Sequence, residues 1–143
     1  MGNMNVKPAD GKLGVLCVGL GAVTSTFMTG VLMARKGLAK PVGSMTQYDK
    51  MRVGRGENKK YLHYGEIVPL ADLKDIVFGA WDVYPANAYE SAINAEVLKE
   101  RDINPVKDEL EKIVPMKAAF DKKFASRLEG DNVKQCKNRW DMM

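Results

Sequence analysis

An apolar run that ends in closely spaced glycines constrains this chain more than any other feature. Residues 13–18 are almost continuously apolar, Gly19 and Gly21 follow, and a helix-forming segment begins directly after them. A nearly unbroken apolar run is typical of a parallel strand that is buried on both faces. Gly19 permits a tight turn out of the strand, and Gly21, which lacks a Cβ, lets a ligand approach the backbone. The pattern predicts a strand, a phosphate-binding turn and a helix.

The helix that follows the turn has apolar residues at helical spacing and is expected to stop at Gly37. The free N–H groups at its start, together with its dipole, suit the pyrophosphate of a dinucleotide. Thr24 stands where the dinucleotide-binding fingerprint has a third glycine, which serves close packing of helix on strand. The motif alone therefore leaves two interpretations open, a dinucleotide site and an ordinary strand-to-helix connection.

Composition narrows the class of protein. The chain has 143 residues, of which 45% are hydrophobic, enough for a core in one domain or in part of a larger one. Its 22 Lys and Arg are interspersed with 18 Asp and Glu, which favours a mixed-charge surface over nucleic-acid binding. Cys17 and Cys136 do not have the spacing of paired metal ligands, so we expect no metal site. With only two cysteines, we expect the protein to reside in the reducing cytoplasm. The sequence shows neither an apolar signal core nor a run of membrane-spanning length, and we expect no membrane partner.

A second apolar strand is expected at residues 76–80, with Trp81 and Asp82 at its carboxyl end. Ligands of parallel sheets bind beyond the carboxyl ends of the strands, so Asp82 is placed to meet a cofactor ribose or adenine edge. An aspartate at a strand end can equally cap a turn or a helix. Asp49 is closer to the roughly 20-residue spacing of the fingerprint, but no clear strand precedes it. We prefer Asp82.

Glycine and proline positions, together with the spacing of apolar residues, predict how the rest of the chain is organised. Residues 1–11 are expected to be a flexible lead-in, and residues 12–143 to be one unit. Residues 40–64 are expected to be mainly a long excursion, whose basic cluster could meet a phosphate, a neighbouring subunit or solvent. The second half is predicted to be helical, with helices near residues 85–101, 104–114, 121–130 and 131–140. The fold class is therefore α/β, an incomplete Rossmann-like domain with two parallel strands.

Several segments, in the same order along the chain, resemble the myo-inositol-1-phosphate synthase family, which is also called inositol-3-phosphate synthase. The strand that ends in Gly-x-Trp-Asp, after a Leu-Ala-Asp-Leu connector, is the most specific of them. The matching segments are Val-Gly-Leu-Gly at residues 18–21 with Ser-Thr at 25–26, Gly-Ser-Met-Thr-Gln at 43–47, the run at 67–73, the strand at 78–83, and Pro-Met at 115–116 with Phe-Asp at 120–121.

The resemblance implies an NAD-dependent isomerase that converts D-glucose 6-phosphate into 1D-myo-inositol 3-phosphate, a step of inositol and phospholipid biosynthesis. In that family NAD oxidises C5 of the sugar, an intramolecular aldol step closes the ring, and the NADH reduces the resulting ketone. A homotetramer is implied as well. The family's catalytic lysines and phosphate ligands belong to a second domain, expected beyond residue 143, so no catalytic residue is named. The cofactor-binding residues implied by the resemblance are Gly19, Leu20, Gly21, Ala22, Val23, Thr24 and Asp82.

An alternative of a different class is a non-catalytic nucleotide-sensing or interaction module that uses the same strand, turn and helix. Nucleic-acid binding through the basic cluster, formed by Arg52, Arg55, Lys59 and Lys60, ranks last because the chain contains no recognised nucleic-acid motif.

Overall fold

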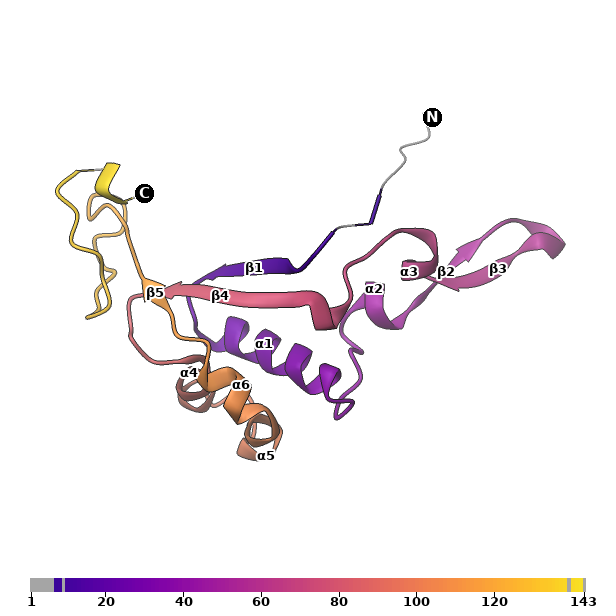
Figure 1. The fold of residues 1–143 in the computed structure, drawn as a ribbon, viewed down its shortest axis with the longest axis horizontal. Coiled ribbons are helices and arrows are strands. Elements are labelled where there is room, and N and C mark those ends of the chain that lie inside the picture. The colour runs from indigo at the N-terminus through magenta and orange to yellow at the C-terminus, as the bar shows by residue number, and fades with distance from the viewer. Residues whose placement is uncertain (1–6, 9, 139, 143) are drawn as a thin grey trace.

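The centre of the computed structural model, which describes residues 7–8, 10–138 and 140–142, is a small parallel sheet (Figure 1). The order of its strands is β1-β4-β5. The strands are β1 (Leu13–Val18), β4 (Ile76–Asp82) and β5 (Met116–Lys117). β1 and β4 pair in parallel along the whole of β1. The two expected strands are confirmed, and β5 is a third strand that the apolar pattern did not predict. The expected lead-in at residues 1–11 falls mostly outside the described residues.

Helices cover one face of this sheet (Figure 1). They are α1 (Ala22–Arg35), α4 (Ala88–Asn94), α5 (Glu100–Ile103), the 3-10 helix η3 (Asn104–Val106) and α6 (Lys107–Glu111). Because side chains alternate along a strand, Cys17 of β1 and Phe78 of β4 point to this face and pack on the core. Met28, Ile103 and Leu110 are fully buried between the helices. The hydrophobic core thus lies on the helical side of the sheet.

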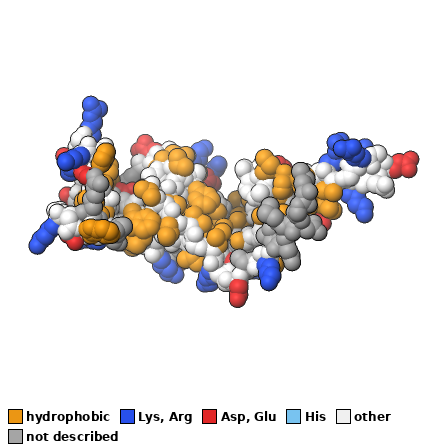
Figure 2. All heavy atoms as spheres, turned by 90° about the horizontal axis from the view of Figure 1, so that it is seen from above, with side chains coloured by type: hydrophobic (Ala, Val, Ile, Leu, Met, Phe, Trp, Pro, Cys, Tyr) orange, Lys and Arg blue, Asp and Glu red, His pale blue; other side chains and the backbone are white. Residues whose placement is uncertain are grey.

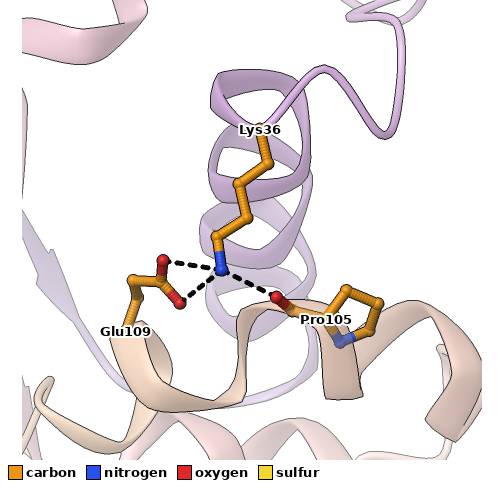
Figure 3. Close-up of polar contacts among 3 residues, drawn as sticks. All are labelled: Lys36, Pro105 and Glu109. Carbon is orange, nitrogen blue, oxygen red and sulfur yellow. Dashed lines mark hydrogen bonds and ion pairs between the residues drawn. The ribbon is translucent and has the colours of Figure 1, made fainter.

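A polar clamp joins the end of α1 to the helices that cover it (Figure 3). The Lys36 ammonium donates a hydrogen bond to the Pro105 carbonyl at 2.7 Å. It also lies 2.8 Å from Oε1 and 3.0 Å from Oε2 of Glu109. The hydrogen bond from Lys36 lowers the pKa of the Glu109 carboxyl below its ordinary value of 4.5. The clamp ties the carboxyl end of α1 to η3 and α6.

The opposite face of the sheet is open and apolar. Leu16 is 61% exposed, and Val77 of the neighbouring strand is 47% exposed. Figure 2 looks onto this side and shows hydrophobic side chains gathered over the middle of the molecule. In the part of the chain that the structure describes, no helix is both long and apolar enough to cross a membrane.

Residues 40–64 are more ordered than the predicted excursion, and this expectation is corrected. They form a short helix and an antiparallel hairpin that projects from the domain (Figure 1). Gly54 and Gly56 have φ of 89° and 55°, which glycine adopts without strain, so they make the hairpin turn. The elements between α1 and β4 are α2 (Met45–Tyr48), β2 (Lys50–Val53), η1 (Gly56–Asn58), β3 (Lys60–His63), α3 (Tyr64–Ile67) and η2 (Leu73–Asp75).

The predicted helical second half is right only as far as Glu111. The single helix expected at residues 85–101 is two helices, α4 and α5, and α4 is capped by the Asn87 side chain, which accepts from the Glu90 N–H at 2.9 Å. The helices expected at 121–130 and 131–140 are wrong. The described residues there form turns and loops, with only a 3-10 turn, η4 (Trp140–Met142), at the end.

Candidate functional site

The glycine turn lies at the carboxyl edge of the sheet, between β1 and α1. Gly19 has φ of 93°, in the region that side chains with a Cβ rarely adopt, and its N–H donates to the Trp81 carbonyl at 2.7 Å. The turn is thereby tied to the end of β4. Gly21 is the N-cap residue of α1, and no side chain caps the helix. A Cβ built on Gly21 would meet nothing within 4 Å, so the space in front of the helix is open.

Asp82, the last residue of β4, lies against this turn. Its Oδ2 accepts a hydrogen bond from the Leu20 N–H, and its Oδ1 accepts from the Tyr84 N–H at 2.9 Å. The structure therefore brings together the glycine turn and the aspartate that the sequence singled out. The bond from the Tyr84 N–H also makes Asp82 the cap of the turn that follows β4. A carboxylate has about four acceptor positions, so both oxygens keep capacity for a further donor such as a ribose hydroxyl.

The other residues predicted to bind a cofactor occupy different positions around the start of α1. Leu20 is buried in the core at 2% exposure, and its N–H is bound to the Asp82 carboxylate. Ala22 and Val23 are exposed in the first turn, and Val23 is 85% exposed. Thr24, at the position of the third glycine of the fingerprint, is half-buried.

A hollow of about 560 Å³ opens beside the turn. Val18, Gly19, Trp81 and Asp82 form one side of it, and Ala118, Phe120 and Leu128 of the chain after β5 form another. Concave sites of a few hundred cubic ångströms with mostly apolar walls are typical of small-molecule and cofactor sites. The sequence pattern does not predict this second wall: Leu128 falls in the helix expected at residues 121–130, and Ala118 and Phe120 lie between the expected helices.

Asp49 and the basic cluster lie away from this edge. The segment between α2 and β2, which contains Asp49, is at the opposite end of the sheet from the carboxyl ends of the strands (Figure 1). Lys and Arg side chains gather instead on the projecting hairpin (Figure 2). Among the described residues, no three His, Cys, Asp or Glu side chains are grouped as a metal ion would require. Of the two aspartates considered, only Asp82 adjoins the glycine turn.

The residues at the turn fit a dinucleotide. The first turn of α1 contains no acidic residue, its N-terminus is uncapped, and α1 is 14 residues long. Such a helix start attracts an anion through its free N–H groups and its dipole. A parallel sheet with a glycine turn after its first strand, and an acidic residue at the end of the adjacent strand, defines the class of protein. It is a dinucleotide-binding domain of the Rossmann type.

Comparison with known proteins identifies the family within this class. Residues 13–143 match the model of the NAD-binding domain family described as myo-inositol-1-phosphate synthase. The chain belongs to this family, and its cofactor is NAD.

Two relatives agree with this assignment, and a solved structure agrees with the fold. Inositol-3-phosphate synthase 1 of Bacteroides thetaiotaomicron is 56% identical over 139 residues, which are 96% of this chain and 32% of the relative. Isozyme 1 of Arabidopsis thaliana is 31% identical over 131 residues, 83% of this chain and 26% of the relative. The crystal structure of inositol-3-phosphate synthase from Caenorhabditis elegans shares the fold, with a TM-score of 0.79 and 23% identity over 96% of this chain and 30% of that chain. The chain thus spans about a third or less of these proteins.

Proposed function

We propose that the protein is an inositol-3-phosphate synthase, which converts D-glucose 6-phosphate into 1D-myo-inositol 3-phosphate with the help of NAD. One observation carries the proposal: the uncapped N-terminus of α1 opens at a glycine turn that is bound to Asp82. The family to which the chain belongs adds support, as do relatives that bear the name of this enzyme.

In this proposal NAD is held by Gly19, Leu20, Gly21, Ala22, Val23, Thr24 and Asp82. NAD supplies the means to remove a hydride from a substrate and to return it. The backbone N–H groups at the start of α1 bind the pyrophosphate, and Gly21 keeps side-chain atoms out of its way. Asp82 holds the turn through the Leu20 N–H, and its carboxylate would accept a hydrogen bond from the adenosine ribose. These residues bind and orient the cofactor and perform no proton transfer.

Residues 12–143 are, in the same proposal, the amino-terminal part of the NAD-binding domain, and the catalytic groups lie beyond residue 143. Two facts support it: the sheet has an exposed apolar face with Leu16 and Val77, and the relatives are about three times as long. Parallel sheets normally have both faces covered.

We further propose a cytoplasmic homo-oligomer, as the family resemblance suggests, that acts on a small phosphorylated sugar rather than on nucleic acid or membranes.

The test is turnover of glucose 6-phosphate by the full-length protein, with and without added NAD. We expect inositol phosphate to form, at a rate that depends on NAD until the protein is saturated with the cofactor. The product is identified by chromatography and phosphorus NMR. If NAD binds but no inositol phosphate forms under any condition, a non-catalytic nucleotide-sensing module explains the domain better.

A further inference from the structure

One side chain from the segment after β5 joins the ends of two strands. The side-chain amide of Asn132 donates a hydrogen bond to the main-chain carbonyl of Asp82 at 3.0 Å and another to that of Met116 at 3.3 Å. The backbone N–H of Asn132 donates to the Val83 carbonyl at 2.8 Å. The main-chain carbonyl of Asn132 accepts from the Ala118 N–H at 2.9 Å. Asn132 therefore bridges the carboxyl ends of β4 and β5.

The bridge adjoins the residue that holds the nucleotide-binding turn. Asn132 binds the main-chain carbonyl of Asp82, while the side chain of the same Asp82 accepts from the Leu20 N–H. β4 and β5 are paired only at Trp81–Met116 and Asp82–Lys117, so few ladder bonds fix the strand ends here. The amide of Asn132 supplies a restraint that the short β5 does not.

Close packing around Asn132 is a second, independent observation. Gly130 lies so near the end of β4 that a Cβ built on it would be 2.3 Å from the Val83 carbonyl oxygen. Real Cβ atoms essentially never come so close to another atom, and the atom in the way is backbone, which cannot move aside cheaply. The segment can dock at this distance because residue 130 is a glycine.

We propose that Asn132 is a positioning residue for the NAD-binding turn and acts through Asp82. By holding the main chain of Asp82, its side-chain amide keeps the carboxylate under the Leu20 N–H and so keeps the turn in the shape that receives the pyrophosphate. The role rests on the proposed NAD site. It also assigns a function to the segment after β5, which carries no part of the dinucleotide fingerprint.

The first measurement is NAD affinity by calorimetry for the full-length wild type, Asn132→Ala and Asn132→Asp. Loss of the two donated bonds is expected to weaken binding about tenfold. Asn132→Asp keeps the size of the side chain but turns an oxygen toward the two carbonyls, so we expect a loss at least as large. Asn94→Ala, which removes an exposed amide on α4, serves as the control and should bind NAD as the wild type does. Wild-type affinity in Asn132→Asp would show that only side-chain volume matters and would overturn the proposal.

The second measurement is a double-mutant cycle that tests the route through Asp82. If Asn132 acts by holding Asp82, the effect of Asn132→Ala on NAD affinity should almost disappear when Asp82 is already alanine. Effects that simply multiply would contradict this route. Circular dichroism and urea unfolding confirm that each variant is folded.

Hydrogen exchange without NAD separates this inference from the proposed function. In Asn132→Ala the Leu20 amide should exchange faster, while amides in the middle of α1 keep their wild-type rates. A merely structural role would accelerate both, and an unchanged Leu20 amide would overturn the inference. If Gly21→Val leaves NAD affinity unaltered, the proposed NAD site fails, whereas the exchange rate of Leu20 still decides the role of Asn132.

Discussion

Gly19 and Gly21 are two residues apart, and the structure gives them different reasons to be glycine. Gly19 has φ of 93°, a backbone conformation that would strain any residue with a Cβ. Gly21 has an ordinary negative φ of −86° and open space where a Cβ would lie. The fold therefore requires a glycine at residue 19 but not at residue 21. In the proposed site, the missing Cβ of Gly21 lets the ligand come close to the backbone.

Replacement of Gly19 tests the part of this distinction that concerns stability. Gly19→Ala should lower the free energy of unfolding by roughly 1–2 kcal/mol, because alanine must adopt a positive φ. Urea unfolding of the wild type and the variant gives the difference. Gly43→Ala is a suitable control, since Gly43 has open space around it and no positive φ. Equal losses in both variants would contradict a special role for the backbone of Gly19.

At the scale of elements, α1 is the helix that joins the core to the candidate site. Its N-terminus opens at the glycine turn, and Lys36 at its other end is clamped to Pro105 and Glu109 (Figure 3). The pKa of Glu109 is lowered by Lys36, so the clamp contributes stability when the carboxyl is ionised. That contribution is fully present above pH 4.5 and is lost as the pH falls through the lowered pKa.

Glu109→Gln tests the clamp through its pH dependence. At pH 7 the variant should be less stable by about 0.2–1 kcal/mol, the usual range for an exposed ion pair. The gap should close as the pH falls below 4.5, because the wild-type carboxyl then loses its charge as well. Urea unfolding at a series of pH values measures it, with Glu57→Gln on the exposed hairpin tip as the matched control. A gap that is independent of pH would argue against the ion pair.

The elements that could be predicted from the sequence are those defined by local patterns. β1 and β4 are continuous apolar runs, and both were found, as was the helix between Gly21 and Gly37. β5 has only two residues, too few to show any periodicity. The hairpin strands have only four residues each, too few to show a clear period, and glycines lie between them. After residue 118 the local backbone bonds, such as the one from the Ala125 N–H to the Asp121 carbonyl, form only isolated turns, and Asn132 pairs instead with the distant Val83. Such pairing leaves no local signal.

The candidate site also has parts that local sequence patterns predict and parts that they do not. The glycine turn and Asp82 were found because a strand, a turn and a strand end each have a local pattern. That Asp82 binds the Leu20 N–H could not be predicted, since it depends on the register of two strands far apart in sequence. Asn132 carried no signal at all, because its role depends on a loop that docks onto both strand ends.

At the scale of the whole molecule, the core lies on one side of the sheet only. Met28 is fully buried among the helices, whereas Leu16 on the other face is 61% exposed. In the 143-residue chain, Met28→Ala should therefore lower the free energy of unfolding by about 2–5 kcal/mol. Leu16→Ala should cost less than about 1 kcal/mol, because little of its surface is buried. Urea unfolding compares the two variants. Equal losses would indicate that both faces are covered in solution.

We propose that NAD rests its pyrophosphate on the turn at Gly21. The most direct test is the NAD affinity of Gly21→Val, measured by calorimetry beside the wild type and Gly43→Val. Because the fold leaves room for a Cβ at residue 21, we expect the variant to fold, with a loss of about 1 kcal/mol of stability because valine is a poorer N-cap residue than glycine. Its affinity for NAD should fall at least about a hundredfold, the equivalent of ~2.7 kcal/mol, while Gly43→Val binds NAD normally. A folded Gly21→Val protein that binds NAD as tightly as the wild type would contradict the account.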